Sequence, residues 1–123
     1  MKKEVHITSA HEHMKVANDY DKMMENEKDS LKKIGLRTVA SQNYFYAGIN
    51  AIESMLAAKD IHSFNHENRN RHMMENPDLF DDEFFRLYNE IVRDLRNKVA
   101  YRGLNGSKYK QIKEFAKKAV DLI

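Results

Sequence analysis

Cationic and polar side chains crowd the segment from Arg93 to Gly103 of this 123-residue chain, which reads Arg-Asp-Leu-Arg-Asn-Lys-Val-Ala-Tyr-Arg-Gly. Arginine recognises phosphate with a planar, bidentate fork of N–H donors, which lysine does not offer. An aromatic ring beside such cations can stack on a nucleobase. The segment therefore predicts a nucleotide or nucleic-acid site, whose residues are Arg93, Arg96, Asn97, Tyr101 and Arg102.

The spacing of these residues suits one outward face of a helix. At 100° per residue, Arg86, Arg93 and Asn97 fall on one stripe, nearly opposite the apolar side, and Arg96 and Tyr101 flank it. The plain alternative is a solvated helix end whose cations complement the negative end of the helix dipole. Several arginines together with an amide and an aromatic favour a binding surface over that alternative.

The composition narrows the function classes. The 21 basic and 19 acidic residues leave a net charge of only +2, so binding to a polyanion requires a local patch. The absence of cysteine excludes disulfides, thiolate zinc sites and a thiol nucleophile. No apolar run approaches the roughly 20 residues that span a bilayer, and no signal peptide is evident. We expect a cytosolic protein that does not contact a membrane.

The histidines and the known catalytic motifs point to no metal or cofactor. His11 and His13 lie about 200° apart on a helix and cannot share an ion. His62 and His66, with acidic neighbours, form at most a weak metal site, and we favour surface histidines. There is no Glu-x-x-His pair, as in di-iron bundles, and no glycine-rich phosphate loop. We therefore expect no metal and no cofactor.

One proline, four glycines and no sustained alternation of apolar and polar residues predict an all-α fold. Ser9 caps the first expected helix and Gly35 ends it. The short connections favour an up-and-down bundle of four long helices and a short one, forming one domain over residues 1–123. The expected helices span about 9–34, 38–59, 67–75, 81 or 82 to 100, and 107 onward. Helical periodicity places Leu31 in the apolar stripe of the first helix. It predicts as inward residues of the last two helices Phe84, Tyr88, Ile91, Val92, Leu95, Val99, Ile112, Phe115, Ala116, Ala119 and Leu122.

The helix expected over 38–59 is the central one, because it is apolar over most of its circumference. Glu53 is the only charged residue between its ends. Tyr44 and Phe45 are predicted core residues. Tyr46 falls on the polar side with Glu53 and several amides, and this side is either a groove or a dimer surface.

These features together resemble the HEPN domain, the higher eukaryote and prokaryote nucleotide-binding domain. The segment Tyr44–Lys59 looks like the aromatic- and alanine-rich helix of that family, and the loop His62–His66 follows it. The segment Arg96–Tyr101 stands where the family carries an Arg-x4-6-His motif. By position Arg96 is the motif arginine, Asn97 is the polar residue after it, and Tyr101 replaces the histidine.

The resemblance implies a HEPN-like bundle of four or five helices, often a homodimer whose motifs face one cleft. Members include metal-independent ribonucleases of toxin–antitoxin and defence systems, and non-catalytic partners of a nucleotidyltransferase. Tyrosine, with a pKa near 10, is a poor base at neutral pH compared with histidine near 6.5. We therefore expect a non-catalytic or weakly active RNA- or nucleotide-binding module that works as a homodimer, with a nucleotidyltransferase partner, or both.

Two alternatives stay open at this point. The first is a genuine metal-independent endoribonuclease, in which Arg96 holds the phosphate and Tyr101 or Asn97 positions the 2′-hydroxyl. The second is a structural interaction bundle whose basic cluster is only a solvated helix end.

Overall fold

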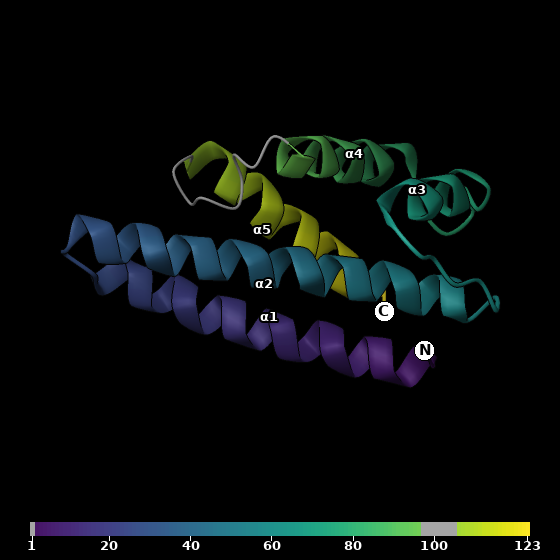
Figure 1. Ribbon diagram of the computed structural model, residues 1–123. Coiled ribbons are helices and arrows are strands. Elements are labelled where there is room, and N and C mark those ends of the chain that lie inside the picture. The colour runs from purple at the N-terminus through teal and green to yellow at the C-terminus, as the bar shows by residue number, and fades with distance from the viewer. Residues whose placement is uncertain (1, 97–105) are drawn as a thin grey trace.

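The computed structural model describes residues 2–96 and 106–123, and within them every regular element is a helix (Figure 1). The prediction of an all-α fold is confirmed. The two longest helices form an antiparallel pair, and the last helix packs against it. The helices are α1 (Lys3–Asn26), α2 (Ser30–Ala57), α3 (His66–Met74), α4 (Asp82–Arg96) and α5 (Gly106–Asp121).

The predicted boundary between the first two helices is wrong. We expected Gly35 to end a helix, but Gly35 lies inside α2, and the chain reverses at residues 27–29. Asp29 caps α2, because its side chain accepts a hydrogen bond from the backbone N–H of Lys32 (3.4 Å). A glycine inside a helix costs only about 1 kcal/mol, which packing against a neighbouring helix offsets.

Two other predictions about these helices are wrong. Ser9 is an internal residue of α1 rather than its cap, and the N-cap Lys2 provides no side-chain hydrogen bond. Leu31, expected to point inward, is 80% exposed because it lies in the first turn of α2 and not at the end of a longer α1.

Small side chains join α1 to α2. Ala10 and Ala17 on α1 and Ala40 and Ala47 on α2 are all fully buried, and each pair is seven residues apart. Seven residues make about two helical turns, so each pair lies on one stripe. Alanine stripes facing one another let two antiparallel helices approach closely along their length.

Phe115 of α5 packs against another side of α2. A Cβ atom added to Gly48 would overlap the ring of Phe115, so only glycine allows this approach. The same ring lies 6.4 Å from Phe45, 5.6 Å from Phe84 and 6.1 Å from Tyr88, measured between centroids. Phe115 therefore connects α2, α4 and α5 in one aromatic core.

The start and core of α4 are as predicted. Asp81 caps the helix by accepting a hydrogen bond from the N–H of Phe84 (2.8 Å). On α4 and α5, the residues predicted to point inward are buried wherever the structure describes their side chains. Leu122, which follows α5 and was also predicted to point inward, is half-exposed. The confirmed residues are Phe84, Tyr88, Ile91 and Val92 on α4 and Ile112, Phe115, Ala116 and Ala119 on α5.

Candidate functional site

The structure describes both the backbone and the side chain of only one of the five residues that we predicted to bind a nucleotide. Arg93 lies exposed on α4. Arg96 is the last residue of α4, and its side chain is outside the description. Asn97, Tyr101 and Arg102 lie outside the described residues, so their roles remain predictions.

A wider charge asymmetry surrounds this segment, and our sequence reasoning missed it. Residues 86–118 contain ten basic and three acidic residues, a net charge of +7, whereas the whole chain carries +2 and the remainder therefore −5. A local sum of charges along the chain would have found this signal. Such a segment attracts polyanions although the protein as a whole is nearly neutral.

The packing of α4 on α5 gathers part of this charge at one end of the helix pair. Two polar contacts define an antiparallel register: Lys118 with Glu83 (3.0 Å) and Gln111 with Glu90 (3.5 Å). Continuing that register by three residues places Arg93 opposite Lys108. The basic end, as we call Arg93, Lys108 and Lys110, lies where α4 ends and α5 begins.

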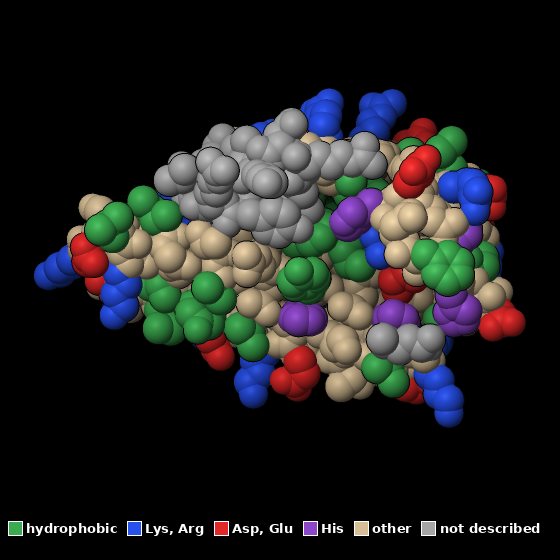
Figure 2. Space-filling view, in the orientation of Figure 1, with side chains coloured by type: hydrophobic (Ala, Val, Ile, Leu, Met, Phe, Trp, Pro, Cys, Tyr) green, Lys and Arg blue, Asp and Glu red, His purple; other side chains and the backbone are tan. Residues whose placement is uncertain are grey.

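Other lysines of α5 serve the structure instead. Lys113 forms an ion pair with Asp21 of α1 (2.7 Å), and Lys118 contacts Glu83 and Glu114. Figure 2 shows basic side chains at the upper edge of the molecule, along α4, and histidine side chains below them over α1, α2 and α3. Other Lys and Arg side chains lie at the left, lower and right edges of this view, and the cations along α4 lie apart from the histidines over α1 and α2.

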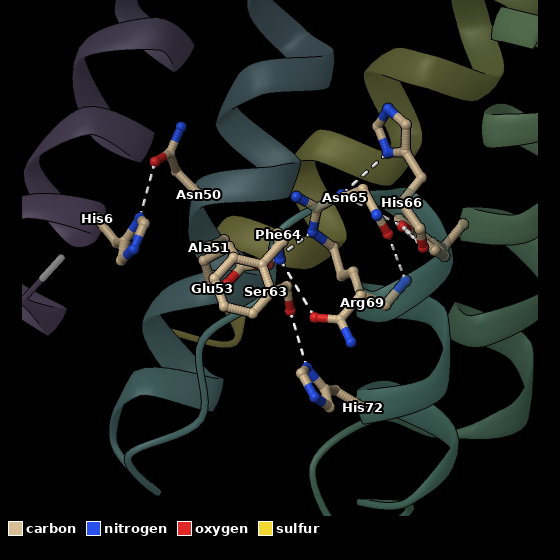
Figure 3. Close-up of polar contacts among 12 residues, drawn as sticks. His6, Asn50, Ala51, Glu53, Ser63, Phe64, Asn65, His66, Arg69 and His72 are labelled. Atoms are coloured by element: carbon tan, nitrogen blue, oxygen red, sulfur yellow. Dashed lines mark hydrogen bonds and ion pairs between the residues drawn. The ribbon is translucent and has the colours of Figure 1, made fainter.

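A buried ion pair forms a second polar centre, at the junction of α2 with α3. Glu53 and Arg69 are only 6% and 8% exposed, and Arg69 Nε lies 2.6 Å from a carboxylate oxygen of Glu53 (Figure 3). The sequence predicted Glu53 beside Tyr46 on a polar side that forms a groove or a dimer surface, whereas the structure buries Glu53 against α3. Arg69 lies sixteen residues further along the chain, and only the folding of α3 onto α2 brings it to Glu53.

The same guanidinium orients His66. Nη1 of Arg69 donates to Nδ1 of His66 (2.9 Å) and also approaches the hydroxyl of Tyr88 (3.5 Å). Because arginine only donates, Nδ1 of His66 must accept, and the hydrogen of the neutral ring is on Nε2. This cluster ties α3 to both α2 and α4, and the simplest role for it is structural.

His62 and His66 do not form the weak metal site considered above. His62 is exposed and faces Asp60 (3.6 Å), whereas His66 contacts Arg69. Among the residues that the structure describes, no three histidine or acidic side chains gather closely enough to hold a metal ion.

Two matched pairs of side chains connect α1 to the polar side of α2. Nδ1 of His6 lies 3.0 Å from Oδ1 of Asn50, and Nδ1 of His13 lies 2.9 Å from Oδ1 of Asn43. The side-chain amide nitrogen of Asn43 donates to the backbone carbonyl of Val39 (3.0 Å), and that of Asn50 donates to the backbone carbonyl of Tyr46 (2.9 Å). The sequence signal was the spacing of seven shared by both histidines and both asparagines, which we did not use.

These hydrogen bonds define the state of both imidazole rings. Each amide oxygen can only accept, so Nδ1 of His6 and of His13 donates. In the neutral rings Nε2 therefore carries a lone pair. This is the opposite tautomer from that of His66.

Tyr46 is the exposed aromatic residue beside these pairs, and it lies on the polar side as predicted. Its side chain is 45% exposed, while Phe45 next to it is buried. The ring lies 5.5 Å from the imidazole of His13 and 6.0 Å from the ring of Phe45. The phenol is thus supported by neighbouring rings and open to solvent.

The buried tyrosines are structural hydrogen-bond donors. Burial raises the pKa of both Tyr44 and Tyr109, and Asp21, which accepts the Tyr109 hydroxyl, raises that of Tyr109 further. Tyr44 donates to Asn18 (2.8 Å). Partial burial acts to raise the pKa of Asp21, but hydrogen bonds from Lys113 and Tyr109 outweigh it and hold that pKa below its ordinary value.

Comparisons with known proteins assign no family to this chain. In the described part of the chain, no helix combines the length and apolar character needed to cross a membrane. No family model, no curated protein and no solved structure matches the sequence or the fold.

Proposed function

We propose that this protein is an RNA- or nucleotide-binding module with a HEPN-like, up-and-down helical bundle. Its binding surface is the basic end together with Arg96, Asn97, Tyr101 and Arg102. It acts as a homodimer, with a nucleotidyltransferase partner, or both, in a toxin–antitoxin or defence system. The observation that carries the proposal is the net charge of +7 on residues 86–118 of a chain whose total is +2.

The exposure of Arg93 supports this assignment. Arg93 and Lys110 are exposed, whereas Lys113 is held by Asp21. Cations that the fold leaves solvated at one end of two packed helices suit a phosphate backbone, which carries one charge per nucleotide. A solvated helix end would not require arginines concentrated beside an asparagine and a tyrosine.

Binding is favoured over efficient cleavage. No histidine follows His72 in the sequence, so the predicted site lacks a base that titrates near neutral pH. Arginines at such a site would still hold phosphate. The module is therefore proposed as non-catalytic or weakly active.

The test is a pair of charge reversals read by fluorescence anisotropy on a labelled single-stranded RNA. Arg93→Glu should weaken binding and lower the slope of log affinity against log salt by roughly 0.7 or more, since each phosphate contact on a single strand contributes about that much. Arg71→Glu, an exposed arginine of α3, is the matched control and should change neither quantity. Equal affinities of the wild type and Arg93→Glu would overturn the proposed function.

Two further measurements separate the roles within this proposal. Incubation with mixed RNA in EDTA, beside Arg96→Ala, detects cleavage, and cleavage lost in the variant would favour the endoribonuclease. Light scattering over a range of concentrations reports the oligomeric state. A strict monomer at high concentration would remove the homodimer from the proposal.

A further inference from the structure

We propose that Tyr46 is a stacking site for a base of single-stranded RNA and that His13 contacts the edge of that base. This inference rests on the proposed function, and it adds a second contact region to it, on α1 and α2. The phosphates are held by the basic end, whereas the base is held by an uncharged aromatic surface.

Tyr46 presents an aromatic side chain on the polar side of the central helix. It lies in the middle of the central helix, between Phe45 and Ala47, which are both buried. Tyr44, Tyr88 and Tyr109 are buried in the core. A phenol ring that is 45% exposed offers part of its aromatic surface to solvent, and a nucleobase can stack on such a surface.

Hydrogen bonds hold the polar neighbours of this ring in one arrangement. His13 is fixed by Asn43, whose amide group is itself fixed by the carbonyl of Val39. The carbonyl of Tyr46 accepts a hydrogen bond from Asn50, which also binds His6. Because these contacts exist before a ligand arrives, little side-chain freedom is lost on binding.

The chemistry of this surface suits a base and not a phosphate. Between Thr38 and Lys59 the only charged residue of the central helix is Glu53, and it is buried against Arg69. Because Nδ1 of His13 donates to Asn43, the lone pair of the ring in its neutral form is on Nε2, and this nitrogen can accept from an exocyclic amine or a ring N–H of a base. In Figure 2 histidine side chains and the basic side chains of α4 are visible from the same side of the molecule, and the proposal requires one strand to contact both regions.

Substitutions at Tyr46 test the stacking contact directly. Tyr46→Ala should weaken RNA binding by roughly 5- to 150-fold, the range that corresponds to about 1–3 kcal/mol for one stacked base. Tyr46→Phe retains the ring and should bind like the wild type. Thermal unfolding of each variant checks that the fold is kept.

Fluorescence gives a readout that a change in stability does not imitate. The chain has no tryptophan, so Tyr46→Trp introduces a single indole at the proposed contact. Single-stranded RNA should quench its emission, whereas heparin, a polyanion without bases, should not. Phe64→Trp, at a loop residue that is 91% exposed, is the matched control and should not be quenched by RNA.

The outcomes distinguish this inference from the function on which it rests. Quenching of the indole at position 46 by RNA alone, with weakened binding in Tyr46→Ala, supports the stacking site. Binding that depends on Arg93 but gives no quenching at position 46 overturns the stacking site and leaves the proposed function intact. Absence of RNA binding by the wild type overturns both.

Discussion

The central helix α2 meets α1 and α3 through polar side chains of opposite character. Toward α1 it uses neutral pairs, His6 with Asn50 and the equivalent pair one heptad away, set beside fully buried alanines. Toward α3 it uses a buried ion pair, Glu53 with Arg69. Each side orients a histidine, but the α1 side makes Nδ1 a donor and the α3 side makes it an acceptor.

The two sides of α2 differ in the free-energy cost of burying their polar groups. Neutral pairs at the edge of an alanine interface select a register and cost little to bury. A buried ion pair loses the hydration of two charges and contributes mainly when both partners are present. The α3 side should therefore be intolerant of single changes, and the α1 side tolerant.

The largest change in the free energy of unfolding is expected on the α3 side. Glu53→Gln leaves the charge of Arg69 buried without a counter-charge and should lower the free energy of unfolding by about 3–5 kcal/mol. The double variant Glu53→Met with Arg69→Met removes both charges and should recover most of that loss. Urea unfolding measures both, and a double variant as unstable as the single one would contradict this account of the α3 side.

The next largest change in the free energy of unfolding is expected on a third face of α2, which packs against α5. Gly48→Ala must displace the buried ring of Phe115 and should lower the free energy of unfolding by about 1–3 kcal/mol. Gly35→Ala meets open space and should instead raise it by about 0.5–1 kcal/mol through helix propensity. Opposite signs for these two variants in thermal unfolding would show that close packing and not helix propensity determines the residue at 48.

A smaller effect is expected on the α1 side. His13→Ala and Asn43→Ala should each lower the free energy of unfolding by about 0.5–1.5 kcal/mol, the usual contribution of one hydrogen bond. A double-mutant cycle should return a positive coupling energy for the two side chains. A coupling as large as the loss in Glu53→Gln would remove the contrast between the two sides of α2.

The smallest effect appears only in acid and involves the contact of α1 with α5. The pKa of Asp21 is lowered in the folded protein, so its contribution to stability is present above the pKa of the unfolded chain and is lost as the pH falls through the folded value. Asp21→Asn should therefore flatten the decline in stability below about pH 4. Chemical unfolding at several pH values measures this dependence. If the free energy of unfolding of Asp21→Asn declines in acid as steeply as that of the wild type, other carboxylates cause the decline.

Several features were predictable because they depend on neighbours along the chain. The all-α class follows from the scarcity of glycine and proline, and the cap at Asp81 from an acidic residue just before an apolar stripe. Burial of Tyr44 and Phe45 follows from the breadth of the apolar face of α2. The break near Asp29 was also encoded locally, by an aspartate that caps α2, but our prediction rested on Gly35 alone.

The sequence by itself determined the helical class, most of the core and the concentration of basic residues between 86 and 118. Only the tertiary structure decided that Glu53 is buried against Arg69, that two histidines face two asparagines, and that Arg93 lies opposite the start of α5. Helix periodicity states which side of a helix a residue occupies, but not which helix covers that side. That choice depends on contacts between segments far apart in the chain, which local patterns do not record.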